Sequence, residues 1–214
     1  VTMVVGSLGA VAQVSWRRIL SFSNVGQVGY LAFALGLFTP ASLAALVYYV
    51  VHHVIVKFAL FLVAGVAERL SGREDVRQGG WLERAPALAG AFGLLALGLI
   101  GLPPTSGFIG KFSLVRAGID AATPLALVVT AIAVATSLLT LLAMLGVWRG
   151  FFWGTPVRAR PAAVRAPIEM TGTTAVMVAV SLAVAVLAGP LFSLASSVAQ
   201  ELADPARYIA AVLP

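Results

Sequence analysis

The chain has 214 residues, of which 60% are hydrophobic and 10% are charged. A soluble protein of this size needs more polar surface than such a composition supplies, so we expect an integral membrane protein. The formal net charge of +6 does not indicate nucleic-acid binding, because the arginines are spread over several loops without interleaved aromatic residues. The absence of cysteine excludes thiolate metal sites, iron–sulfur clusters, disulfides and thiol catalysis.

Long apolar runs separated by polar segments predict an all-α bundle of transmembrane helices. A spanning helix needs about 20 apolar residues, and the runs predict one partial span followed by full ones. They cover residues 1–13, 19–38, 42–67, 86–116, 124–148 and 170–193, and residues 194–214 form a C-terminal tail. The chain opens inside an apolar run without the features of a signal peptide, so we expect it to be part of a longer protein.

The segment 86–116 is too long for one straight span, and we expect a helix broken near 103–107. Pro103 and Pro104 remove backbone donors, and flanking glycines such as Gly107 permit unusual dihedral angles. Backbone carbonyls are therefore freed near the membrane centre, where Thr105 and Ser106 are suited to bond with them. Broken helices in transporters lie along the path of the transported ion.

The distribution of arginine predicts the orientation. If 86–116 crosses the membrane once, the loops near Arg17, at 68–85 and at 149–168 share one side and carry ten of the twelve arginines. Cytoplasmic loops collect basic residues, so we expect this side to be cytoplasmic and the membrane to be the cell inner membrane. Two crossings would scatter the arginines over both sides.

The only two lysines, Lys57 and Lys111, lie inside apolar runs. Ionisable groups at bilayer depth are costly and usually functional. Tyr49, His53 and Lys57 follow one another at i, i+4 spacing, so they share a helix face, along which His53 and Lys57 could pass a proton. The alternative is that Lys57 only binds backbone carbonyls. His52 points away from this face and is interpreted as a packed side chain.

Other polar residues in the spans are open to two interpretations. Ser23, Asn24 and Gln27 could line a hydrated path or bond to neighbouring helices. Lys111 follows the helix break by about two turns and is a second path candidate, against the alternative of a packing kink. A later group is interpreted as helix-packing residues: Thr136, Ser137 and Thr140. No carboxylate lies inside a span, so we expect no side-chain sodium site. We also expect no other metal site and no cofactor.

Three strings carry a resemblance to a known family: RRILSFSNVGQVGY at 17–30, HHVIVKFALFLVAG at 52–65 and GLPPTSGFIGKF at 101–112. In this order and spacing they resemble the antiporter-like membrane subunits shared by Mrp-type sodium/proton antiporters and respiratory complex I. The resemblance implies a fold of two inverted five-helix repeats. This chain would be its second half, from the end of the ninth helix through the fourteenth.

The resemblance also implies roles for particular residues. His53 and Lys57 match the H-x-x-x-K motif of the eleventh helix, and Lys111 matches the lysine of the broken twelfth helix, which is assigned to proton exit or transfer to the neighbouring subunit. Gln27 stands where relatives have histidine or glutamine.

The implied function is that of a membrane subunit of a multisubunit Na⁺/H⁺ antiporter, with other subunits, protons, Na⁺ and the lipid bilayer as partners. The alternative is a proton-pumping membrane-arm subunit of NADH:quinone oxidoreductase. The segments 61–80 and 148–154 are most similar to the D-type subunits of Mrp antiporters and favour the first.

Overall fold

The computed structural model of the protein describes residues 1–154 and 166–204, together with 206, 209 and 212. The elements of this part of the chain are helices, which confirms the predicted all-α fold. In chain order they are α1 (Thr2–Ala12), α2 (Trp16–Leu37), α3 (Pro40–Ser71), α4 (Trp81–Arg84), α5 (Pro86–Ile100), α6 (Ser106–Asp120), α7 (Pro124–Val147), the π-helical turn η1 (Trp148–Phe152), α8 (Ile168–Val186) and α9 (Ala188–Ala203).

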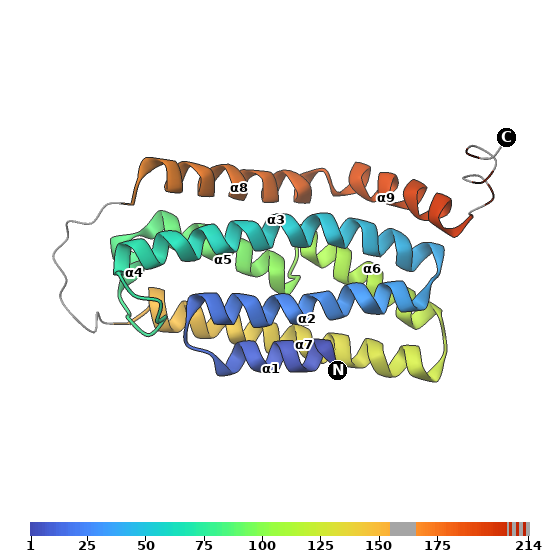
Figure 1. Ribbon diagram of the computed structural model, residues 1–214, viewed down its shortest axis with the longest axis horizontal. Helices are drawn as coiled ribbons and strands as arrows, with labels where there is room; N and C mark the ends of the chain where they lie inside the picture. The colour runs from blue at the N-terminus through green and yellow to red at the C-terminus, as the bar shows by residue number, and fades with distance from the viewer. Residues whose placement is uncertain (155–165, 205, 207–208, 210–211, 213–214) are drawn as a thin grey trace.

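The long helices run along one common axis and form a bundle (Figure 1). α3 lies between α2 on one side and α8 with α9 on the other, while α1 and α7 cover the far side of α2. Within the described residues, four helical segments are long and apolar enough to cross a membrane: Trp16–Leu37, Pro40–Ser71, Pro124–Phe152 and Ile168–Val186.

Local sequence signals set where the central helices begin and end. Thr39 and Ser42 exchange side-chain and backbone hydrogen bonds in a capping box ahead of α3, and Pro40 occupies its first turn. Thr123 caps α7 by accepting from Ala126 N at 3.2 Å. Gly72 ends α3 with φ of 68°, a left-handed conformation that glycine adopts without steric cost.

The predicted broken helix consists of α5 and α6, which follow each other end to end in Figure 1 and together cross the bundle once. α5 ends at Ile100, Gly101 turns the chain with φ of 87°, and Pro103 and Pro104 stand in the interruption. Gly107 is helical rather than part of the turn. Its role is close approach, because an added Cβ would lie 1.8 Å from Gly98 O.

The last predicted span differs from the structure. α8 ends at Val186 and α9 begins at Ala188, so the helix divides before residue 193, and residues 194–203 of the expected tail belong to α9, which packs along α3. The cause is Pro190, which has no N–H and whose ring clashes with the carbonyl four residues earlier, that of Val186.

The polar segment after α3 ties together one end of the bundle. Trp16 N donates to Glu74 O at 2.9 Å, and Gln78 N donates to Gly150 O at 2.9 Å, so the segment bonds both to the start of α2 and to η1. Inside it, the guanidinium of Arg77 bonds to Asp75 and lowers the pKa of that carboxyl.

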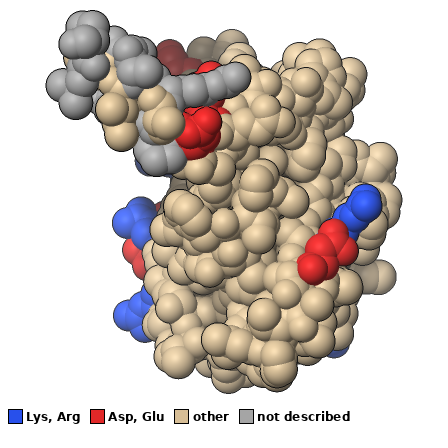
Figure 2. All heavy atoms as spheres, turned by 90° about the vertical axis from the view of Figure 1, so that its right-hand side faces the viewer, with Lys and Arg blue, Asp and Glu red and all other residues tan. Residues whose placement is uncertain are grey.

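Arginines gather at this same end. Among the described residues, every arginine except Arg116 stands where α2 begins, where α3 ends, in the segment 72–85 between α3 and α5, or just after α7 ends. Figure 2 shows the opposite end, whose surface is mostly uncharged, and where Arg116 pairs with Asp120 at 3.7 Å. Three arginines expected in the loop 149–168 lie outside the described residues: Arg158, Arg160 and Arg165.

An aromatic cluster closes the arginine-rich end. The ring of Trp16 meets Phe92, Phe151 and Phe152 edge-on, with centroids 5.6, 5.1 and 6.2 Å away. Such pairs add to the stability gained from burial alone. Trp16 therefore joins α2 to α5 and η1.

Replacing Trp16 with alanine should lower the free energy of unfolding by about 3–5 kcal/mol, because its side chain is 1% exposed and leaves a cavity between three elements. The thermal denaturation midpoint of the full-length protein measures this. Trp153→Ala, at a side chain that is 62% exposed, is the matched control and should leave the midpoint nearly unchanged. Equal shifts in both variants would contradict the assigned role of the cluster.

Candidate functional site

Lys57 projects from the middle of α3 toward α2 and is 5% exposed. Its Nζ donates to Ser23 Oγ and, at 3.4 Å, to Leu20 O. Ser23 in turn donates to Leu20 O at 3.1 Å. In the described part of the chain Lys57 has no carboxylate partner, so its ammonium group is bound by neutral oxygens alone.

His53 lies one turn before Lys57 on the same face of α3. Its Nε2 is 3.0 Å from Asn24 Oδ1 on α2. With the amide oxygen accepting, Nε2 carries the proton and Nδ1 is left as the basic nitrogen. Nδ1 is buried and has no hydrogen-bond partner among the described residues, so it is a group that can still accept a proton.

Tyr49 lies one further turn along and donates to Gln27 Oε1 on α2. Its ring stacks on His52 and His53, with centroids 5.6 and 6.3 Å away, and its centroid is 6.2 Å from that of Tyr30. Tyr49 therefore contacts both histidines of α3 and a buried tyrosine of α2.

His52 points from α3 to the helix break rather than to α2. Its Nδ1 is 2.8 Å from the hydroxyl of Ser106, the first residue of α6. The sequence placed His52 on a different face from His53, and the structure shows that this second face meets α6. His52 is 1% exposed, and its interpretation as a packed side chain stays a prediction.

Lys111 folds back from α6 onto the broken end of α5. Its Nζ donates to Leu99 O at 3.0 Å, to Ile100 O at 3.2 Å and to Ser137 Oγ at 3.4 Å. The ammonium group also lies 4.8 Å from the ring centroid of Tyr30. The carbonyls freed by the break are thus bound by Lys111, which is 7% exposed.

Ser137 was not expected at this site. It contacts Lys111, and its Oγ lies 2.9 Å from the hydroxyl of Tyr30, which also donates to Ala133 O at 2.6 Å. The only sequence signal was a polar residue within the apolar run of α7. Thr140 bonds through its hydroxyl to Thr136 O in its own helix, and its interpretation as a helix-packing residue stays a prediction.

Of the two residues expected to satisfy the freed backbone, only Thr105 does so, by donating to Leu102 O at 2.7 Å. Ser106 instead contacts His52. The site therefore contains two groups of polar side chains, one around Lys57 and His53 and one around Lys111. Tyr49 stacks on His53 of the first group and lies next to Tyr30, whose ring contacts Lys111 of the second.

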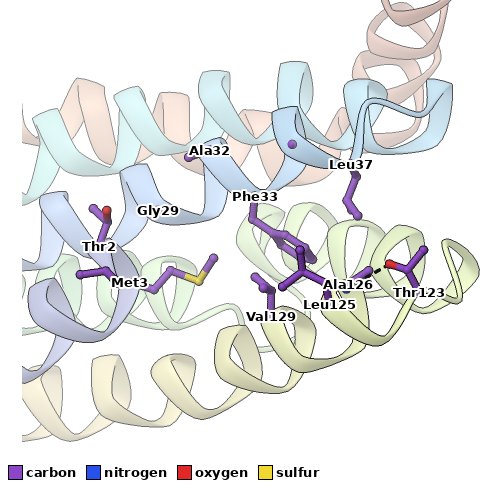
Figure 3. A pocket seen from close by; sticks show the side chains of 12 residues that line it. Thr2, Met3, Gly29, Ala32, Phe33, Leu37, Thr123, Leu125, Ala126 and Val129 are labelled. Carbon is purple, nitrogen blue, oxygen red and sulfur yellow. Dashed lines mark hydrogen bonds between the residues drawn. The ribbon is translucent and has the colours of Figure 1, made fainter.

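A separate cavity of about 400 Å³ lies between α1, α2 and α7 (Figure 3). Met3, Phe33, Leu37 and Val129 line it, and it contains neither lysine. Its apolar lining distinguishes it from the polar site.

The model of the family "NADH:quinone oxidoreductase/Mrp antiporter, TM" matches residues 1–140. The chain belongs to this family. It is 38% identical, over 99% of its length, to the D-type subunit of the Na⁺/H⁺ antiporter of Alkalihalophilus pseudofirmus, of which it covers 43%. It is 32% identical, over 89% of its length, to an N-type subunit of the NADH-quinone oxidoreductase of Sorangium cellulosum, of which it covers 38%.

The fold agrees with this membership. A chain of the Mrp complex from a Dietzia species superposes with a TM-score of 0.89 at 34% identity, over 100% of this chain and 47% of the other. The chain is thus a multi-pass membrane segment of this antiporter and oxidoreductase family, and it spans less than half the length of these relatives.

Replacing Gly107 with alanine should push α6 away from α5, because the new Cβ would lie 1.8 Å from Gly98 O and 2.8 Å from His52 Nε2. Overpacking of this kind costs roughly 1–3 kcal/mol. The thermal midpoint should therefore fall, whereas Gly90→Ala on α5, where a Cβ has no described atom within 4 Å, should not lower it, because alanine is the better helix former. A silent Gly107→Ala would mean that α5 and α6 do not meet closely there.

Proposed function

We propose that this chain is part of the membrane subunit of a multisubunit Na⁺/H⁺ antiporter and that its buried lysines and histidines carry protons. The observation that supports this most is that Lys57 and Lys111 are both buried inside the helix bundle and bound by neutral oxygens. A lysine paired with a carboxylate would lose its ion pair on releasing a proton. These two lysines have no such pair to lose in the described residues.

The proposed path begins at Lys57 and His53. Lys57 passes its proton toward the basic Nδ1 of His53, and the neutral lysine keeps two N–H groups that can still donate to Ser23 Oγ and Leu20 O. Tyr49 has a hydroxyl held by Gln27 and a ring stacked on His53, so it lies where a proton would leave this group. Each step moves one proton between groups that can both donate and accept.

Lys111 is the proposed exit group, and its contacts suggest how its charge acts on the helix break. Its ammonium group donates three hydrogen bonds, two to carbonyls of α5 and one to the hydroxyl of Ser137. The carbonyls at the end of a helix carry partial negative charge, which a cation stabilises. Loss of the proton weakens the hold of Lys111 on α5, so proton release at Lys111 is coupled to the geometry of the α5–α6 junction.

The location and sidedness are part of the same proposal. The protein belongs in the cytoplasmic membrane, with the arginine-rich end, including Arg17 and the segment 68–85, facing the cytoplasm. Its partners would be the other subunits of the complex, with protons and Na⁺ as the exchanged ions. The support for Na⁺ is the similarity to the D-type subunit of a Na⁺/H⁺ antiporter.

A second candidate is the proton-pumping membrane arm of NADH:quinone oxidoreductase. It is favoured by the similarity to a subunit of that oxidoreductase, at 32% identity over most of this chain. The proposed proton path would serve either assembly. The subunits that co-purify with the full-length protein separate the two: small antiporter subunits in the first case, flavin and iron–sulfur chains in the second.

Lys57→Ala should reduce proton-coupled cation exchange to background, because a neutral side chain cannot replace a relay lysine. Exchange is measured in everted vesicles that carry the full-length complex. Lys57→Arg should also fail, since a guanidinium does not release its proton at a working pH. Immunodetection of the assembled complex is the control, and normal exchange in Lys57→Ala would rule out this path.

Lys111→Ala and the double change Pro103→Ala, Pro104→Ala test the role of the helix break. If Lys111 carries protons, its replacement should abolish exchange while complex yield stays near normal. The double change restores backbone donors and straightens the segment, so exchange should fall although Lys111 is intact. Full exchange in Lys111→Ala, together with a low complex yield in the double variant, would identify the break as a packing feature.

A further inference from the structure

A second cavity, of about 550 Å³, opens at the arginine-rich end of the bundle. It lies where α2 begins and α3 ends, next to the first turn of α8, and its polar walls carry Arg17, Arg69 and Arg73. Gly65 and Met170 form its apolar side. None of these residues belongs to the proposed proton path, so the cavity has no role in the function derived above.

The three arginines differ in what they bind. Arg17 makes hydrogen bonds of 2.8 to 3.2 Å to both carboxylate oxygens of Glu68, which neutralises it. In the described part of the chain, the side chains of Arg69 and Arg73 have neither an ion pair nor a hydrogen bond. The remaining charge on the wall is Glu74. Two guanidinium groups are therefore available for an anion, opposed by the carboxylate of Glu74 on the wall and by that of Asp75, which lies near Arg73.

An apolar stripe of α3 leads from the cavity toward the bilayer centre. Three apolar residues precede Gly65 on α3 at helical spacing: Phe61, Phe58 and Val54, which are 39%, 51% and 59% exposed. Positions three or four residues apart share a helix face. The described residues place no helix over this stripe, so it stays open to the lipid phase on this part of the chain.

The depth of the cavity fits the headgroup region. α3 has 32 residues, a length of about 48 Å at the usual rise of an α-helix. The hydrocarbon core is about 30 Å thick. α3 is therefore long enough for its C-terminal end to lie at the level of the lipid phosphates. Arg69 lies in the last turn of α3 and Arg73 just beyond it.

We propose that this cavity binds the headgroup of an anionic phospholipid. Its phosphate bonds to Arg69 and Arg73, and its acyl chains lie along Phe61, Phe58 and Val54. The charge of the wall selects an anion, and the continuous apolar stripe favours a lipid over a free phosphate ion. Glu74 weakens the site by repulsion.

The test titrates the detergent-purified full-length complex with phosphatidylglycerol and follows its thermal midpoint. Arg69→Gln combined with Arg73→Gln should raise the concentration for half-maximal stabilisation by roughly tenfold or more. Glu74→Gln should lower that concentration. Arg18→Gln is the matched control: it removes an exposed arginine at the same end that does not line the cavity, and it should leave the titration unchanged.

Phosphatidylcholine and inorganic phosphate serve as probes of the ligand class. Phosphatidylcholine should not reproduce the arginine-dependent shift, and inorganic phosphate should not compete for it at millimolar concentration. Mass spectrometry of co-purified lipid gives a second readout and should detect less phosphatidylglycerol in the double variant. The proposal is overturned by an unchanged titration in the double variant, by an equal effect of Arg18→Gln, or by inorganic phosphate giving the full shift.

Discussion

Two ammonium groups must be held inside an apolar bundle whose described spans offer them no carboxylate, and this constraint organises the helices around them. A buried charge is tolerated only where polar atoms replace the water it has lost. For Lys57 these atoms come from Ser23 and Leu20 on α2. For Lys111 they come from carbonyls that exist as free acceptors only because α5 stops at Ile100. The helix break and the buried lysine therefore depend on each other.

Small residues let the polar groups meet. A Cβ on Gly110 would lie 2.7 Å from the Tyr49 ring, and one on Gly107 would lie 1.8 Å from Gly98 O. These two glycines bring α6 within reach of α3 and α5, so that His52, on which the ring of Tyr49 stacks, contacts Ser106 of α6. Close approach also leaves little room for the helices to shift independently.

Much of this could be predicted from the chain alone. Apolar runs identified the long helices, the paired prolines identified the break, and i, i+4 spacing brought Lys57 and His53 to one face. Contacts between distant segments could not be predicted, because helical periodicity says which residues share a face but not which helix that face meets. Ser137 lies 26 positions from Lys111 and His52 lies 54 from Ser106, so their pairing depends on tertiary packing. The division of α8 from α9 depends on Pro190, whose effect a hydropathy pattern does not register.

The central claim is that the group around Lys57 and the group around Lys111 form one path that passes through Tyr49. Proton-coupled exchange in vesicles carrying Tyr49→Phe tests it most directly, because this change removes one hydroxyl and keeps the ring that packs on His52 and His53. Tyr48→Phe is the matched control, since Tyr48 is equally buried on the same helix but packs on Phe192 of α9. The account predicts that exchange falls by roughly tenfold or more in Tyr49→Phe and is unchanged in Tyr48→Phe. Normal exchange in Tyr49→Phe would contradict it.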